Sequence, residues 1–348
     1  MEIRLKNNII SDDTMPYIIA EMSANHNHDI DLAKEIIHAA KESGADCLKL
    51  QTYKPETMTL NSNKDYFKIK RGTWKGENLY NLYEKAHMPW EWQEELKKEC
   101  EKVGLDFLST PFDRTSVDFL EGLDVEFYKI ASFEITDIPL IKYIASKQKP
   151  IIMSTGMSTI EEIKEAIDAI ESMNNKNYAI LKCSSSYPSI SKDMNLSCIP
   201  DLKSRFGKLV GLSDHTLGDL SAIVATSLGA SIIEKHFCLS RDIITPDSSF
   251  SMEPKELKCM IDKIKDVKNA LGEIKYGPTD NEKASLNFRR SIFITKDIKK
   301  GELFTENNIK IIRPSYGIEP KYYEDIIGKR ASGDISKEEP LNWNMVEK

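Results

Sequence analysis

The sequence predicts an α/β protein in which a (β/α)8 barrel of the TIM type, at 1–272, precedes a small, mostly β domain at 285–348. Short apolar runs alternate with segments of helical periodicity eight times, which is typical of barrels built from βα units. A break rich in Gly, Pro and Asn follows at 276–281, so we expect a linker at 273–284. Beyond it, short strand-like pieces without a long helix predict the second domain.

The eight expected strands are short apolar runs that end in polar residues. They lie at 17–21, 47–51, 106–110, 127–131, 150–154, 178–183, 209–213 and 231–236. The clearest helices are expected at 31–43, 90–103, 159–173, 217–228 and 254–271. Eight units, with a long amphipathic segment after the last strand, favour a closed barrel over a doubly wound open sheet.

One connection is much longer than the others. An insertion at 53–89 separates the second and third expected strands. A long segment that follows a barrel strand lies on the C-terminal face of the barrel, where active sites are built. We therefore expect the insertion to lie at the functional face.

Composition argues against several classes of protein. The 348 residues include 48 Lys and Arg against 55 Asp and Glu, a net charge of −7, which argues against a nucleic-acid-binding protein. No apolar run approaches the ~20 residues of a membrane span, and the N-terminus lacks the apolar core of a signal peptide. The six cysteines form no C-x-x-C pair, which favours reduced thiols in a cytoplasmic protein.

Two lysines interrupt otherwise apolar strands. Charged residues are rarely buried without a partner, so Lys49 and Lys129 either pair with carboxylates, extend to the strand edge or bind an anion. Hydroxyl groups also end strands, at Ser132, Ser154 and Ser213. Ammonium, hydroxyl and backbone donors together are what a phosphate group requires, which favours an anion site.

Two histidines, His215 and His236, end adjacent expected strands. Because neighbouring strands lie about 4.8 Å apart, the imidazoles are placed to share a metal ion that keeps open positions for water and substrate. The alternative is two independent histidines, one of them a general acid or base.

Seven blocks of sequence, in order, resemble the sialic acid synthase family. They are 19–27 (IAEMSANHN), 49–52 (KLQT), 109–112 (STPF), 128–134 (YKIASFE), 154–157 (STGM), 211–216 (GLSDHT) and 234–237 (EKHF). Members of this family condense phosphoenolpyruvate with an amino-sugar aldehyde to make nonulosonic acids. The tail at 291–302 and 312–314 is similar to the antifreeze-like (SAF) domain that ends these enzymes.

Within the family, four segments look most like the branch that makes pseudaminic acid. They are 23–26 (SANH), 71–74 (RGTW), 79–84 (LYNLYE) and 247–251 (DSSFS). That branch uses 2,4-diacetamido-2,4,6-trideoxy-altrose, whose 6-methyl group needs an apolar pocket that Trp74 or Phe250 could supply. N-acetylneuraminate and legionaminate synthases are the alternatives.

The resemblance implies roles for individual residues. The phosphoenolpyruvate ligands it implies are Lys49, Lys129, Ser132, Ser154 and Ser213. Catalysis would fall to the two lysines with Glu21 and Gln51, which would lie near the reacting aldehyde and water. A divalent metal ion, Mn²⁺ or Mg²⁺, would be held by His215 and His236.

The resemblance also implies the sugar ligands Glu134, Tyr187, Asp247 and Arg313. Arg313 would come from the tail of a partner subunit, which implies a homodimer with exchanged C-terminal domains. Two rival interpretations remain: an aldolase that forms a Schiff base through one lysine, and a non-catalytic sugar- or ice-binding protein suggested by the tail alone.

Overall fold

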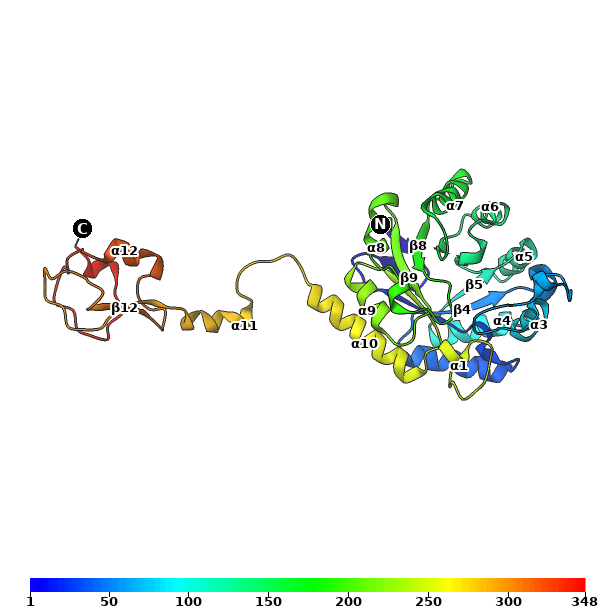
Figure 1. Cartoon of the computed structure of the whole chain (residues 1–348), viewed down its shortest axis with the longest axis horizontal. Helices are drawn as coiled ribbons and strands as arrows, with labels where there is room; N and C mark the ends of the chain where they lie inside the picture. The colour runs from blue at the N-terminus through cyan, green and yellow to red at the C-terminus, as the bar shows by residue number, and fades with distance from the viewer. Residues whose placement is uncertain (348) are drawn as a thin grey trace. The chain divides into compact units, whose positions relative to one another are not determined.

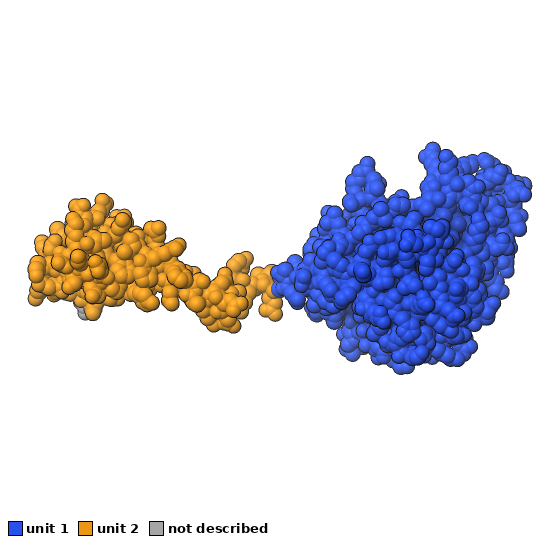
Figure 2. Space-filling model, turned by 90° about the horizontal axis from the view of Figure 1, so that it is seen from below, with its two compact units in different colours: residues 1–272 blue, residues 273–348 orange. Residues whose placement is uncertain are grey.

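The computed structural model describes residues 1–347 and divides the chain into two compact units, Met1–Gly272 and Glu273–Lys348 (Figure 2). Each unit has its own hydrophobic core. None of the helices in the described residues is both long enough and apolar enough to cross a membrane.

The first unit is a closed barrel of eight parallel strands (Figure 1), so the predicted (β/α)8 fold is confirmed. Around the barrel the order is β10-β3-β4-β5-β6-β7-β8-β9. The strands are β3 (Tyr17–Glu21), β4 (Cys47–Thr52), β5 (Asp106–Pro111), β6 (Tyr128–Ile130), β7 (Ile151–Ser154), β8 (Tyr178–Cys183), β9 (Leu209–Asp214) and β10 (Ile232–His236).

Eight principal helices connect and cover these strands. They are α1 (Ile30–Ser43), α4 (Trp90–Val103), α5 (Arg114–Gly122), α6 (Ile138–Ala145), α7 (Ile160–Ser172), α8 (Cys198–Phe206), α9 (Leu220–Ser227) and α10 (Pro254–Leu271). Their ends follow from local chemistry. The Asp29 carboxylate accepts hydrogen bonds from the first turn of α1, and Gly44, at φ 97°, ends that helix in the left-handed region.

A short hairpin that the sequence analysis did not anticipate precedes the barrel. Strands β1 (Glu2–Arg4) and β2 (Ile9–Ser11) pair antiparallel. Ile3 and Ile10 are buried in a cluster with inward-facing apolar side chains from the N-terminal ends of the barrel strands, such as Ile19. This end of the barrel is therefore closed by apolar packing, and the polar groups of the interior gather at the C-terminal end.

The insertion leaves the C-terminal end of β4 and returns at α4. It contains the short helix α2 (Pro55–Met58), a 3₁₀ turn at Asp65–Phe67 and helix α3 (Leu79–Ala86). Its position agrees with the prediction that it lies on the face where strands end.

The second unit is small and is built around one antiparallel pair of strands, β11 (Ser291–Ile294) and β12 (Ile309–Ile312), with isolated antiparallel bridges such as Ile298 with Ile335. Short helices α11 (Asp280–Lys283) and α12 (Tyr323–Ile326) accompany them. Ile292, Phe304 and Leu341 belong to its core. The predicted small, mostly β tail is confirmed.

Candidate active site

Four buried charged side chains meet inside the C-terminal end of the barrel. Lys49 Nζ lies 2.7 Å from Glu21 Oε2 and 3.6 Å from Glu234 Oε1. Lys129 Nζ lies 3.4 Å from the same Glu234 oxygen. All four side chains are at most 6% exposed. These side chains meet because the side chains of a strand point alternately inward and outward, and each of the four points inward from its own strand.

The surroundings of the cluster shift the pKa values of its members in different directions. Burial raises the pKa of Glu234, but the nearby ammonium groups of Lys129 and Lys49 outweigh it and the pKa is lowered. Burial and repulsion from Glu234 raise the pKa of Glu21 despite the contact with Lys49. Burial lowers the pKa of Lys129. Lys49 and Lys129 thus share the Glu234 carboxylate, and only Lys49 has Glu21 as a second partner.

Hydroxyl groups surround the lysines. Lys129 Nζ donates to Ser154 Oγ over 2.7 Å, and Ser213 Oγ donates to Glu234 Oε1 over 3.1 Å. The backbone N–H of Gly156 donates to Ser132 Oγ over 2.9 Å. A side chain at Gly156 would collide with Ser132, so this close approach requires glycine. Of the three serines predicted as phosphate donors, Ser154 and Ser213 therefore bond to members of the charge cluster, and Ser132 bonds to the backbone of Gly156.

The two histidines of the strand ends lie side by side, with ring centroids 5.3 Å apart. Nδ1 of His215 is 2.8 Å from the Ser184 carbonyl oxygen. A carbonyl only accepts, so Nδ1 carries a proton and Nε2 is the ring nitrogen of His215 that remains for another partner. Burial and the neighbouring His215 hold the pKa of His236 well below its usual range.

These imidazoles fit a divalent cation. Nδ1 of His236 is buried and has no hydrogen-bond partner within the described part of the chain. No group of three or more His, Cys, Asp and Glu side chains in residues 1–347 is arranged to hold a metal. Protein would therefore supply two ligands, and the remaining positions would fall to water and substrate.

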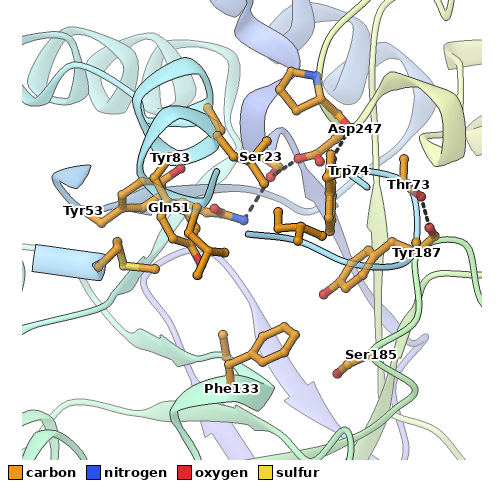
Figure 3. A pocket seen from close by; sticks show the side chains of 18 of the residues that line it. Ser23, Gln51, Tyr53, Thr73, Trp74, Tyr83, Phe133, Ser185, Tyr187 and Asp247 are labelled. Carbon is orange, nitrogen blue, oxygen red and sulfur yellow. Dashed lines mark hydrogen bonds between the residues drawn. The ribbon is translucent and has the colours of Figure 1, made fainter. Parts of the chain in front are cut away.

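A cavity of about 710 Å³ opens beside the cluster (Figure 3). Its lining includes five of the predicted site residues: Gln51, Glu134, Tyr187, His236 and Asp247. Gln51 connects the cavity to the charges, because its Nε2 donates to Glu21 Oε1 over 2.9 Å and to Ser23 Oγ over 3.0 Å. Ser23 Oγ in turn donates to Asp247 Oδ2 over 2.5 Å.

Burial raises the pKa of two carboxyl groups in this cavity. The pKa of Glu134 is raised to about 7, and that of Asp247 is raised although Ser23 and a backbone N–H bind it. Oε2 of Glu134 is buried and has no hydrogen-bond partner among residues 1–347. A carboxyl group that is half protonated near neutral pH can both donate to and accept from a ligand hydroxyl or amide.

Some features of the site were not predicted. Glu234 shares a strand face with His236 by its spacing, but the sequence assigned it no role, and it joins both lysines. Thr110 accepts a 3.4 Å hydrogen bond from Lys49. Arg313 lies in the second unit, exposed and directly after β12.

A closed barrel with buried lysines, paired histidines and a large cavity at one mouth is typical of enzymes that act on small charged molecules. Comparisons with known proteins identify the family. The NeuB family matches residues 36–276, and the SAF domain matches residues 289–347. The chain belongs to the NeuB family, and the resemblance to sialic acid synthases is confirmed.

Its relatives cover nearly the whole chain. The pseudaminic acid synthase of Helicobacter pylori is 49% identical over 96% of this chain and 98% of that protein. The pseudaminic acid synthase of Campylobacter jejuni is 44% identical over 93% of this chain and 94% of that protein. The crystal structure of N-acetylneuraminic acid synthetase from Leptospira borgpetersenii, in complex with citrate, has a TM-score of 0.74 at 32% identity and covers 83% of this chain and 96% of that one. The chain is therefore an enzyme of this family, not a non-catalytic sugar- or ice-binding protein.

Replacing Glu134 by Gln should change how stability depends on pH. The folded pKa of about 7 exceeds the ordinary 4.5, so the folded state holds an extra proton between these values. The contribution of Glu134 to stability is therefore present at low pH and is lost as pH rises through 7, by up to about 3 kcal/mol. Thermal unfolding measured from pH 5 to pH 8 should show that the stability of Glu134→Gln, relative to that of the wild type, increases as the pH rises.

Glu84→Gln, which removes an exposed carboxyl from α3, is the matched control and should track the wild type. An offset between Glu134→Gln and the wild type that stays constant from pH 5 to 8 would contradict the assignment.

Proposed function

We propose that this chain is a pseudaminic acid synthase, which joins phosphoenolpyruvate, 2,4-diacetamido-2,4,6-trideoxy-altrose and water into pseudaminate and phosphate. One observation carries the proposal: two lysines buried inside the barrel adjoin a cavity of about 710 Å³ at the barrel mouth. The identity of 44–49% to two pseudaminic acid synthases supports the choice of sugar.

The lysines and serines bind phosphoenolpyruvate in this proposal. Lys49 and Lys129 hold its charged groups, and the hydroxyl groups of Ser132, Ser154 and Ser213 add donors. In the free enzyme Glu234 takes the place of the anion by neutralising the ammonium groups. The lysines also stabilise negative charge on the phosphate as it leaves.

The chemistry balances with these groups. The C3 carbon of phosphoenolpyruvate bonds to the aldehyde carbon of the sugar, and the aldehyde oxygen takes up a proton and becomes a hydroxyl group. Water adds to C2 and releases a proton, which balances the one taken up. The C2–O bond to phosphate then breaks and releases inorganic phosphate. Glu21 accepts the proton of the water, since its carboxyl is held by Lys49 and Gln51 at the boundary between the cluster and the cavity. Glu134, Tyr187 and Asp247 hold the sugar.

His215 and His236 would hold a divalent ion, Mn²⁺ or Mg²⁺. Such an ion supplies Lewis acidity toward an aldehyde oxygen when bound. The chain's own contribution is to orient His215 through its bond to the Ser184 carbonyl and to hold the pKa of His236 low through burial.

His215→Ala should bind less Mn²⁺, measured by metal analysis after dialysis, and should lose metal-dependent turnover by more than about 100-fold. His38→Ala is the control, because His38 is exposed on α1 and pairs only with Glu99. It should keep both properties. Full activity in His215→Ala would overturn the metal assignment.

The substrate is tested by phosphate release from phosphoenolpyruvate with three sugars: N-acetylmannosamine and the two 6-deoxy diacetamido hexoses. We expect the highest kcat/KM with the altro sugar. A higher value with N-acetylmannosamine or the other hexose would indicate an N-acetylneuraminate or legionaminate synthase instead. No release with any sugar, or a borohydride-trapped lysine adduct, would contradict a synthase altogether.

We also infer a homodimer with exchanged C-terminal domains. Large apolar side chains are exposed in the loops after five consecutive strands, β6 to β10: Phe133, Met157, Ile190, Leu217 and Ile244. An exposed apolar face around the mouth of an active site is expected to be buried by a partner. A second copy of this chain would bury it and would bring its own Arg313 to the site. The cytoplasm is the proposed compartment, because all six cysteines are free.

Mixing two inactive variants tests the exchange. Lys129→Met inactivates the barrel and Arg313→Ala the tail. If Arg313 acts on the partner's barrel, co-expression should restore about a quarter of wild-type activity, since half of the dimers are mixed and each has one complete site. No restoration, in dimers shown by mass to be mixed, would place Arg313 in its own subunit's site or outside the site.

A further inference from the structure

The insertion forms one wall of the cavity. It contributes apolar side chains to the lining, including Ile69, Trp74, Leu79 and Leu82. The opposing lining comes from barrel loops and is more polar, with Glu134 among its members. The cavity therefore presents a mostly apolar wall, which also contains the charged Arg71 and the hydroxyl group of Thr73, and a more polar wall to the same ligand.

Trp74 is fixed in this wall by contacts to two barrel loops. Its Nε1–H donates to the Pro246 carbonyl over 2.9 Å, and its ring lies 5.5 Å from the Tyr187 ring (Figure 3). Next to it, the Thr73 hydroxyl donates to the Tyr187 carbonyl. Thr73 and Trp74 thereby attach the insertion to both barrel loops, which fixes the position of the indole.

Phe250 does not share this role. Its ring is 6.3 Å from Trp74 and 5.1 Å from His236, but it is only 2% exposed and does not line the cavity. Phe250 packs near Trp74 and His236 without lining the cavity. Of the two aromatic residues that the sequence offers for an apolar subsite, only Trp74 faces the ligand space.

We infer that Trp74 is the residue by which this enzyme selects a sugar that lacks a 6-hydroxyl group; the inference rests on the proposed function. The aldehyde carbon has to lie at the charge cluster and the histidines. The other end of the six-carbon chain, C6, then extends along the aromatic side chains toward Trp74. A methyl group packs against the indole, whereas a hydroxyl group there would lose its hydrogen bonds to water without a replacement.

The test compares kcat/KM for the 6-deoxy substrate and for its 6-hydroxy counterpart. Wild type should prefer the 6-deoxy sugar on the order of 10- to 100-fold. In Trp74→Ala this ratio should fall by about tenfold or more, while the KM for phosphoenolpyruvate stays unchanged. A general loosening of the insertion would raise that KM as well. Leu60→Ala is the matched control, since Leu60 is an exposed apolar residue of the same insertion outside the cavity lining.

The experiment distinguishes failure of the proposed function from failure of the role assigned to Trp74. A wild-type enzyme that turns over no 6-deoxy sugar would contradict the proposed function. A wild-type enzyme that does so, with the same 6-deoxy preference in Trp74→Ala, would overturn only the role of Trp74. Trp74→Phe keeps the apolar surface but loses the bond to Pro246, so it should retain more of the preference than Trp74→Ala does.

Discussion

Ammonium groups buried inside a closed barrel must be neutralised by anions, and the arrangement of the site depends on this requirement. Another buried lysine of the barrel, Lys235, differs from Lys129 in its ion-pair partners. Lys235 faces outward from β10 and has its own carboxylate, Asp214, at 2.7 Å, with the Thr216 carbonyl as a second partner. Lys129 shares Glu234 at 3.4 Å with Lys49. The outward lysine has a carboxylate of its own, whereas in the inner cluster one carboxylate, Glu234, serves two lysines.

The rest of the first unit restricts this cluster to one end of the barrel. The β1–β2 hairpin and the inward apolar layer close the N-terminal end. At the C-terminal end, the histidines adjoin the charges and the insertion walls the cavity. The charged cluster, the paired histidines and the mostly apolar cavity wall thus all lie at this end of the barrel.

The sequence alone predicted the barrel and most of the polar cluster, because strand alternation is a local property. Lys49 and Gln51, or Glu234 and His236, share a face by their spacing, and barrel closure then brings their strands together. The β1–β2 hairpin was missed because each strand has only three residues. The sequence analysis placed the insertion at this face and offered Trp74 or Phe250 for an apolar pocket. It could not choose between them, because the choice depends on contacts such as that of Trp74 with Pro246, 172 residues apart.

The most direct test of the account is calorimetric titration of phosphoenolpyruvate into wild type, Lys129→Met and Lys182→Met. Lys182 is the matched control, a strand lysine that lies against α7 and α8 and not in the cluster. The account predicts that Lys129→Met, folded by circular dichroism, binds at least about 30-fold more weakly than wild type, while Lys182→Met binds normally. Equal affinity in all three proteins would show that the inner lysines do not hold the anion.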